Sequence, residues 1–457
     1  TLTKKNSFTT GQVYQSVIKR EREGGYLGKT IQVIPHVVDE IKERIYAATE
    51  DNDFLIIELG GTVGDIEGLP FMEAIRSIRH ELPKTNTMNI HLSLVPYIKA
   101  AGELKTKPTQ HSVQELRRIG ITPHMLVCRT ERELPKALKD KLALACDIDR
   151  NAVIEAGDAQ SIYQVPLQFI KEGILTPLSE HFNIKIKPNM EKWDTLVKNI
   201  LLPQGEVTIA FVGKYLDLKE SYKSLIEALI HAGAHLSTKV NIHWCDSERI
   251  EDVGAYDIIG NSDAILVAGG FGQRGVNGKL AAIKYARENK IPYLGICLGM
   301  QLAIIEFAKN VLGLEDANSI EFDPNTKNPL IYLIDEFIDQ SGNKQIRTHE
   351  SPMGGTMRLG EYPFEPLKGT HLQKAYGNNE IYYERHRHRY EANPKYKQVL
   401  EDAGMIISGQ SDGLIEAIEL KDHPWFVGVQ FHPEFTSHLE TPNPIILEFV
   451  RQATKNK

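Results

Sequence analysis

The chain has 457 residues, of which 41% are hydrophobic and 25% are charged, as in ordinary soluble globular proteins. Its net charge of -7 argues against a general nucleic-acid binder or a binder of anionic membranes. No signal peptide or membrane-spanning apolar run is visible and the four cysteines lack disulfide-framework spacing, so we expect a cytoplasmic protein that binds neither nucleic acid nor membranes.

Short apolar runs alternate with helical patterns in the first part of the chain, which is typical of parallel sheets covered by helices. The pattern predicts strands at 54–60, 91–97, 124–130 and 151–157, and helices over 71–82 and 111–120. It breaks near residue 185, where two prolines flank a short amphipathic piece. We therefore predict two doubly wound α/β domains, at 1–184 and 205–457, joined by a linker at 185–204.

The second part begins with a buried strand at 206–213 and a helix that the pattern predicts to end at Gly233. Two strand-to-turn units follow, "DAILVAGGFG" (263–272) and "IPYLGICLG" (291–299), and the sequence beyond residue 330 is richer in β patterns. The second domain is thus predicted to combine parallel α/β units with a β-rich end.

Cys297 lies between two glycines in "GICLG", where a strand is expected to end and a helix to begin. Such a turn can hold a nucleophile in a strained, exposed position, and the helix N-terminus favours a thiolate. Most free cysteines are instead small buried hydrophobes. From this turn alone both interpretations stay open.

A histidine and a carboxylate follow in "FHPEF". In an extended strand His432 and Glu434 share a face, so the carboxylate could orient the imidazole of a nucleophile–base–orienter triad. A turn with a solvated histidine is the alternative for this motif by itself. The glycines of "VAGGFGQRG" could supply free N–H groups for an oxyanion, although glycine turns are common.

Together these three motifs resemble a class I, triad-type glutamine amidotransferase. The resemblance implies that Cys297 attacks glutamine, His432 is general base and acid, and Glu434 orients His432. It also implies glutamine-binding positions at Gly269, Gly270, Phe271, Leu298, Gly299, Met300, Gln301, Glu321 and Arg387.

Arg387 belongs to the run "ERHRHRYE", in which three arginines would share one face of a strand and two histidines the other. Charge alternation of this kind is typical of a solvated edge strand, and a nucleic-acid patch is disfavoured by the acidic chain. One arginine of the run could clamp the glutamine carboxylate in two-pronged geometry.

The first part of the chain carries an acidic, glycine-rich stretch, "IIELGGTVGDIEG". Glu58 is expected at the carboxyl end of a buried strand, where doubly wound sheets bind ligands, and a carboxylate there suits Mg2+ on nucleotide phosphates. An acidic loop that caps the next helix is the alternative.

A second stretch, "GELKTKPTQHS", carries two lysines. Pro108 predicts extended backbone at Lys107, so Lys105 and Lys107 could face one phosphate, with the next helix beginning at His111. Two solvated loop lysines are the alternative.

With "SFTTGQVY", "GGYLGKTIQVIPH" and the motifs above in the same order, the whole chain resembles the CTP synthase family. The resemblance implies an ATP-dependent amidoligase that phosphorylates UTP and aminates it to CTP with ammonia from glutamine. GTP would activate the glutaminase and CTP would inhibit by feedback. It implies Mg2+ at Glu58, ATP at Arg129 and Asp158, and UTP or CTP at Asp65, Ile66, Glu67, Lys105, Thr106, Lys107, Pro108, Thr109, Gln110 and Lys141.

The family begins with a strand, a phosphate-binding glycine loop and a helix, and no such motif precedes residue 58 here. The first domain is thus expected to be a P-loop-type amidoligase domain without its first βαβ segment. We expect this polypeptide by itself to hydrolyse glutamine and not to make CTP.

Two rival functions remain open at this level: an amidotransferase with another acceptor, such as a GMP synthase, and a non-catalytic nucleotide-binding filament subunit. The first does not account for "KTKPTQ" or "GGTVGDIE", and an intact Cys, His and Glu set argues against the second. The family resemblance implies a homotetramer and filaments.

Overall fold

The computed structural model describes residues 4–49, 52–214, 220–333, 336–338, 344–346, 357–378 and 381–457. The chain divides into two compact units, Thr1–Asn189 and Met190–Lys457. The expected linker contains a helix, α8 (Glu191–Leu201), that belongs to the second unit and packs on α9 (Lys223–His235). The domain boundaries themselves stay predictions.

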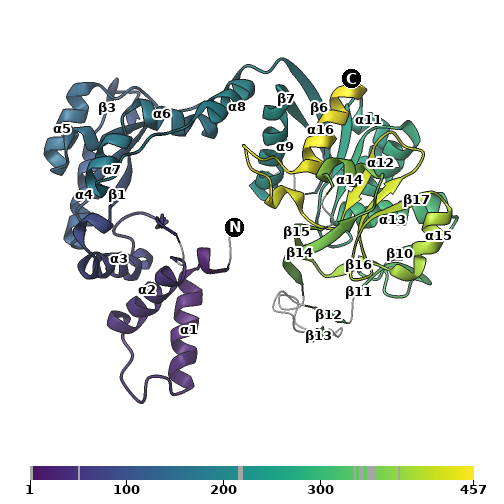
Figure 1. Cartoon of the computed structure of the whole chain (residues 1–457), viewed down its shortest axis with the longest axis horizontal. Helices are drawn as coiled ribbons and strands as arrows, with labels where there is room; N and C mark the ends of the chain where they lie inside the picture. The colour runs from purple at the N-terminus through teal and green to yellow at the C-terminus, as the bar shows by residue number, and fades with distance from the viewer. Residues whose placement is uncertain are drawn as a thin grey trace. The chain divides into compact units, whose positions relative to one another are not determined.

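The first unit combines a small parallel sheet with helices (Figure 1). Its strands β1 (Ile90–Leu94), β4 (Met125–Thr130) and β5 (Val153–Gly157) pair in the order β1-β4-β5. A two-stranded ribbon joins β2 (Tyr97–Ile98) to β3 (Glu103–Leu104). The helices are α1 (Thr10–Arg22), α2 (Val38–Ala47), α3 (Leu69–Glu81), α4 (Lys107–Arg118), α5 (Lys136–Cys146), α6 (Val165–Lys171) and α7 (Leu175–Phe182).

Three of the four strands predicted in this unit are confirmed, at β1, β4 and β5. The strand predicted at 54–60 is wrong, because among the described residues this segment pairs with no other strand. Ile56 is 94% exposed there. An apolar run predicts burial, but a strand also needs a neighbour that accepts its hydrogen bonds.

The helix predicted over 111–120 begins earlier than expected, at Lys107. The extended backbone predicted for Lys107 is wrong, because Pro108 lies in the first turn of α4, where its missing N–H costs nothing. Thr106 before it already has helical dihedral angles. Lys105 and Lys107 therefore do not alternate along a strand.

The second unit is built on a nine-stranded sheet in the order β15-β14-β17-β18-β19-β9-β8-β6-β7. The strands from β7 to β19 run parallel, and β18, β17, β14 and β15 continue antiparallel. Their bounds are β6 (Gly205–Gly213), β7 (Thr238–Asp246), β8 (Ala264–Val267), β9 (Tyr293–Ile296), β14 (Arg358–Pro366), β15 (Tyr382–His388), β17 (Met405–Ser411), β18 (Leu414–Leu420) and β19 (Phe426–Val429).

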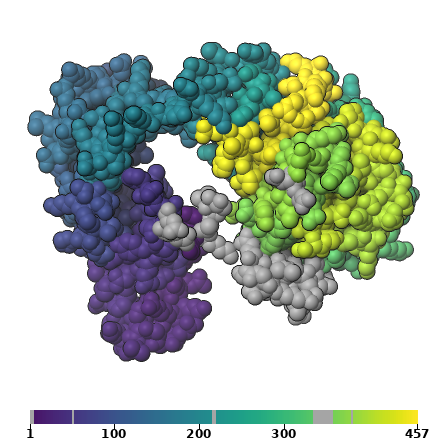
Figure 2. Space-filling view, viewed as in Figure 1, coloured from purple at the N-terminus to yellow at the C-terminus, as the bar shows by residue number. Residues whose placement is uncertain are grey.

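Helices cover both faces of this sheet. One core packs the sheet against α12 (Val276–Asn289) and α13 (Leu298–Asn310), and the other packs it against α9 and α16 (Pro444–Asn456). Residues that follow α13, green to yellow, form much of the face of this unit seen in Figure 2. The remaining elements are α10 (Ser247–Val253), α11 (Ala255–Ile259), α14 (His371–Tyr376), α15 (Lys397–Asp402), β10 (Ala317–Ser319), β11 (Asn328–Leu333), β12 (Glu336–Ile338), β13 (Lys344–Ile346) and β16 (Tyr390–Ala392).

The mixed α/β class is as predicted, with the predicted parallel units and β-rich end. The end predicted for the first helix of the second unit is wrong, because α9 continues two residues past Gly233. A Cβ at Gly233 would lie 2.4 Å from the carbonyl oxygen of Thr238, so this glycine allows close approach of β7 instead of ending the helix. In the described part of the chain, no helix is long and apolar enough to cross a membrane.

Candidate active site

Cys297 lies between β9 and α13, at the carboxyl end of a central strand. Its backbone has φ +53° and ψ −104°, which a non-glycine residue rarely adopts, and its N–H donates to Val429 O at 2.7 Å. A Cβ at Gly295 would lie 2.5 Å from the Tyr293 hydroxyl, and one at Gly299 would lie 2.2 Å from Val267 O. The strained turn with small neighbours is confirmed, but Cys297 is buried and not exposed as predicted.

His432 and Glu434 meet by a different route from the one predicted. Residues Pro433–Phe435 form a 3-10 turn after β19, so the extended strand expected here is wrong, since Pro433 favours the first turn of a helix. The turn still brings His432 Nδ1 to 2.7 Å from Glu434 Oε1. The pair is largely buried.

The charge state of His432 follows from its neighbours. Burial lowers the pKa of the imidazole, but the negative charges of the Glu434 carboxylate and the Cys297 thiolate, with their hydrogen bonds, outweigh burial and raise it to about 10. A Cβ at Gly269 would lie 3.1 Å from His432 Cε1 and 3.5 Å from Cys297 Cβ. The structure therefore brings the expected base and nucleophile together beside Gly269, with Glu434 bonded to Nδ1 of the base.

Gly269–Phe271 follow β8 and line this centre from the other side. Two lysines lie behind the loop: Lys214 donates to the Phe271 carbonyl, and Lys279 Nζ donates to the Ala268 carbonyl at 3.3 Å. Lys279 is 1% exposed, and burial, with Lys214 nearby, lowers its pKa to about 8. Because carbonyl and N–H point in opposite directions across a trans peptide, these contacts orient the N–H groups of the loop.

Glu321 is tied to the same loop. Its Oε1 accepts from the Gly272 N–H at 2.8 Å, and burial raises the pKa of this carboxyl. Arg387 lies on the exposed face of β15, the edge strand, whose His386 and His388 are buried, so the predicted alternation is confirmed. The glutamine-binding roles of both side chains stay predictions.

A buried pair of glutamines approaches the thiol. Gln301 Nε2 donates to Gln430 Oε1 at 3.0 Å and to Tyr390 O at 2.8 Å, and Gln430 Nε2 donates to Cys297 Sγ at 3.7 Å. Gln430 was not predicted, although a polar residue at the end of the buried strand before "FHPEF" is a usable signal. Leu298 and Met300, also expected near glutamine, are buried in the first turn of α13.

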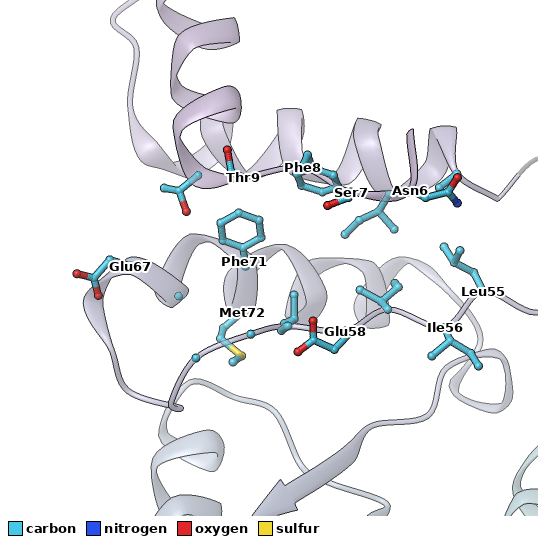
Figure 3. Close-up of a pocket in the computed structure, with 18 of the residues that line it drawn as sticks. Asn6, Ser7, Phe8, Thr9, Leu55, Ile56, Glu58, Glu67, Phe71 and Met72 are labelled. Carbon is cyan, nitrogen blue, oxygen red and sulfur yellow. The ribbon is translucent and has the colours of Figure 1, made fainter. Parts of the chain in front are cut away.

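The acidic loop of the first unit lines a cavity of about 670 Å³. Figure 3 shows Glu58 beside Met72, with Glu67 at one end and its carboxylate directed outward; Asp65 also lines the cavity. Phe8 and Phe71 face each other in it, with ring centroids 6.1 Å apart. Among the described residues there is no cluster of three or more metal-binding side chains.

The remaining nucleotide residues do not line this cavity. Thr106, Thr109 and Gln110 are buried and bonded internally: Gln110 Nε2 donates to Thr106 Oγ1, and Thr109 Oγ1 donates to Leu94 O. Ile66, Lys107 and Pro108 are exposed.

Four further residues predicted to bind nucleotides carry charges. Lys105 forms an ion pair with Glu103, and Lys105 and Lys141 both lower the pKa of that exposed carboxyl. Arg129 lies at the end of β4 and forms an ion pair with Asp158, which follows β5, at 2.5 Å. The carboxyl edge of the sheet therefore gathers Arg129 and Asp158, as expected for a ligand-binding edge.

In comparisons with known proteins, two family models match successive parts of the chain. Residues 1–184 match the family model described as CTP synthase N-terminus, and residues 217–452 match glutamine amidotransferase class-I. The CTP synthase of Sulfurimonas denitrificans is 66% identical over 448 residues, 98% of this chain and 83% of the relative. The chain belongs to the CTP synthase family.

Other relatives support membership in the same family. The CTP synthase of Wolinella succinogenes is 66% identical, over 99% of this chain and 82% of its own length. A solved glutaminase domain of Trypanosoma brucei CTPS, with bound acivicin, is 39% identical with a TM-score of 0.50, covering 55% of this chain and 95% of that domain. Membership in the CTP synthase family makes the chain a glutamine-dependent ligase of pyrimidine biosynthesis, with ATP, UTP and glutamine as the substrates of the family.

Proposed function

We propose that the second unit hydrolyses glutamine through Cys297, His432 and Glu434, and that the ammonia serves the reaction of the family, in which UTP, phosphorylated by ATP at its 4-oxygen, is aminated to CTP. The observation that carries this proposal is the meeting of Cys297 and His432 around Gly269, with Glu434 Oε1 2.7 Å from His432 Nδ1. This is the arrangement of nucleophile, base and orienter that acyl transfer requires.

The glutaminase half then proceeds in two steps. The Cys297 thiolate attacks the side-chain amide carbon of glutamine, and N–H groups of Leu298 and the Gly269–Phe271 loop hold the oxyanion. His432 gives its proton to the leaving nitrogen, so ammonia departs and a glutamyl thioester remains. His432 next takes a proton from water, which attacks the thioester and releases glutamate and the thiolate.

The raised pKa of His432 fits this sequence, since the imidazolium is the proton donor that the first step needs. Glu434 stabilises that charge and fixes the tautomer through Nδ1. Gln430 donates toward the sulfur and, through Gln301, connects the thiol to the glutamine-binding side of α13.

The first unit would supply the acceptor chemistry. Phosphate displacement by ammonia leaves nitrogen on C4 of the pyrimidine and releases inorganic phosphate. Arg129 and Asp158 would contact ATP, whereas Lys105, Lys141 and the acidic loop would form the site shared by UTP and the inhibitor CTP. Glu58 would hold Mg2+, which usually binds one or two protein carboxylates together with nucleotide phosphates.

Regulation and assembly belong to the same proposal. GTP would activate the glutaminase near the "GGFGQRGV" loop, CTP would inhibit by feedback, and the chain would form homotetramers and filaments in the cytoplasm. Sedimentation of the chain with and without nucleotides would measure the assembly.

The test is glutamate release from glutamine by the chain and by two cysteine variants. Cys297→Ala should abolish release, whereas Cys245→Ala, which alters a buried cysteine on β7, should retain it. Conversion of UTP to CTP, with glutamine or ammonium as nitrogen source, is measured in parallel. Persistent glutaminase activity in Cys297→Ala would overturn the proposed nucleophile.

A further inference from the structure

The segment His432–Thr436, which carries both the base and its orienter, is held at its two ends by neighbouring residues of β15. The His432 N–H donates to the carbonyl of Arg385 at 2.8 Å, and Thr436 Oγ1 donates to Glu384 Oε2 at 2.7 Å. One contact uses the main chain and the other uses a side chain. Only the second can be changed by substitution without altering the backbone.

Glu384 is a buried carboxylate, 2% exposed, whose bonding partners are neutral donors. Its Oε1 accepts from Tyr376 Oη and from Asn443 Nδ2, both at 2.6 Å. Asn443 Nδ2 also donates to Thr436 Oγ1 at 2.9 Å. Glu384, Thr436 and Asn443 thus close a ring of hydrogen bonds that joins β15, the turn and the N-cap of α16.

Such a group is costly to the fold. A buried carboxylate without a cationic partner loses hydration that three neutral donors replace only in part. Burial, with a smaller contribution from Glu434, accordingly raises the pKa of Glu384 to about 7, against the opposing effect of Tyr376, Thr436 and Asn443. Buried groups with strongly shifted pKa values concentrate at functional sites.

We propose that Glu384 is a positioning residue of the glutaminase site: its carboxylate fixes Thr436, and with it the turn that directs Glu434 toward His432. The proposal rests on the triad function proposed above. It assigns Glu384 no contact with glutamine. When the carboxylate takes up a proton it becomes a poorer acceptor, and its hydrogen bond from Thr436, which holds the end of the turn, weakens.

The first test compares Thr436→Val with Thr436→Ser. Valine has the shape of threonine without the hydroxyl, whereas serine keeps the hydroxyl. We expect Thr436→Val to lower kcat for glutamine hydrolysis about 10-fold with KM within two-fold, and Thr436→Ser to stay within two-fold of wild type in both. Equal kcat in valine and serine variants would overturn the proposal.

The second test uses pH and Glu384→Gln, which imitates the uncharged form. The ratio of wild-type to variant kcat should be about 10 at pH 8.5 and should approach 1 at pH 5.5, because Glu384 is then protonated in the wild type. The other titratable groups facing Glu384, namely Tyr376, Glu434 and His432, are present in both proteins and cancel in the ratio. A ratio that does not change with pH would indicate a merely structural role.

The experiments distinguish failure of the proposed triad from failure of the positioning role of Glu384. If Cys297→Ala keeps glutaminase activity, the triad itself is wrong. If Cys297→Ala is inactive while Thr436→Val and Glu384→Gln both match wild type, only the positioning role is wrong.

Discussion

The buried Lys279 allows the free-energy cost of burying a charge in this chain to be measured. Its ammonium is fully buried in α12, and burial lowers its pKa from 10.5 to about 8. Because the native pKa lies about 2.5 units below the ordinary value, folding loses about 3 kcal/mol at roughly 1.4 kcal/mol per unit. Lys279→Met keeps the length of the side chain and removes the charge, so it should stabilise the second unit by about that amount at pH 7.

The pH dependence gives the sign of the effect. Below pH 8 lysine is protonated in both native and unfolded chains, so the cost is present in full. Between pH 8 and 10.5 the unfolded chain binds more protons than the native one, and wild-type stability rises with pH. The advantage of Lys279→Met should therefore fall to about half at pH 9.5.

The assay is urea unfolding followed by tryptophan fluorescence. All three tryptophans, Trp193, Trp244 and Trp425, belong to the second unit, so the signal reports that unit within the intact chain. Lys284→Met, which removes an exposed lysine from the same helix, is the matched control and should change stability by less than about 0.5 kcal/mol. A gain that is the same at pH 7 and 9.5, or a loss, would refute the reasoning.

Three further changes probe the site and its support. Gly269→Ala should lower glutaminase kcat/KM at least 10-fold, because the new methyl would crowd His432 Cε1 at 3.1 Å; wild-type kinetics would show that the loop moves freely. Glu434→Gln removes a charge that raises the pKa of His432, so that pKa, followed by NMR of the imidazole, should fall. Its kcat should fall with it, and an unchanged imidazole titration would contradict the assignment. Arg358→Met leaves Glu416 buried without its cation and should destabilise the second unit by about 3–5 kcal/mol in the tryptophan assay, with partial recovery on adding Glu416→Gln.

The sequence by itself determined the class of fold and predicted the three residues of the proposed triad. Local features were sufficient there: alternating apolar and helical patterns for the α/β units, and Gly295, Cys297 and Gly299 for a strained turn whose glycines permit contacts that no Cβ would allow. The family motifs, spread over the whole chain, indicated the CTP synthase family, which no single pattern could specify.

Only the tertiary structure decided how these residues meet. A period of two predicted a shared face for His432 and Glu434, but a 3-10 turn brings them together, and its far end is fixed by Glu384, about 50 residues earlier in the chain. The apolar run at 54–60 did not become a strand because pairing depends on a neighbour and not on composition. Gln430 and Lys279 acquire their importance from burial beside the thiol and its loop, and burial is a property of the packed chain that local sequence patterns do not contain.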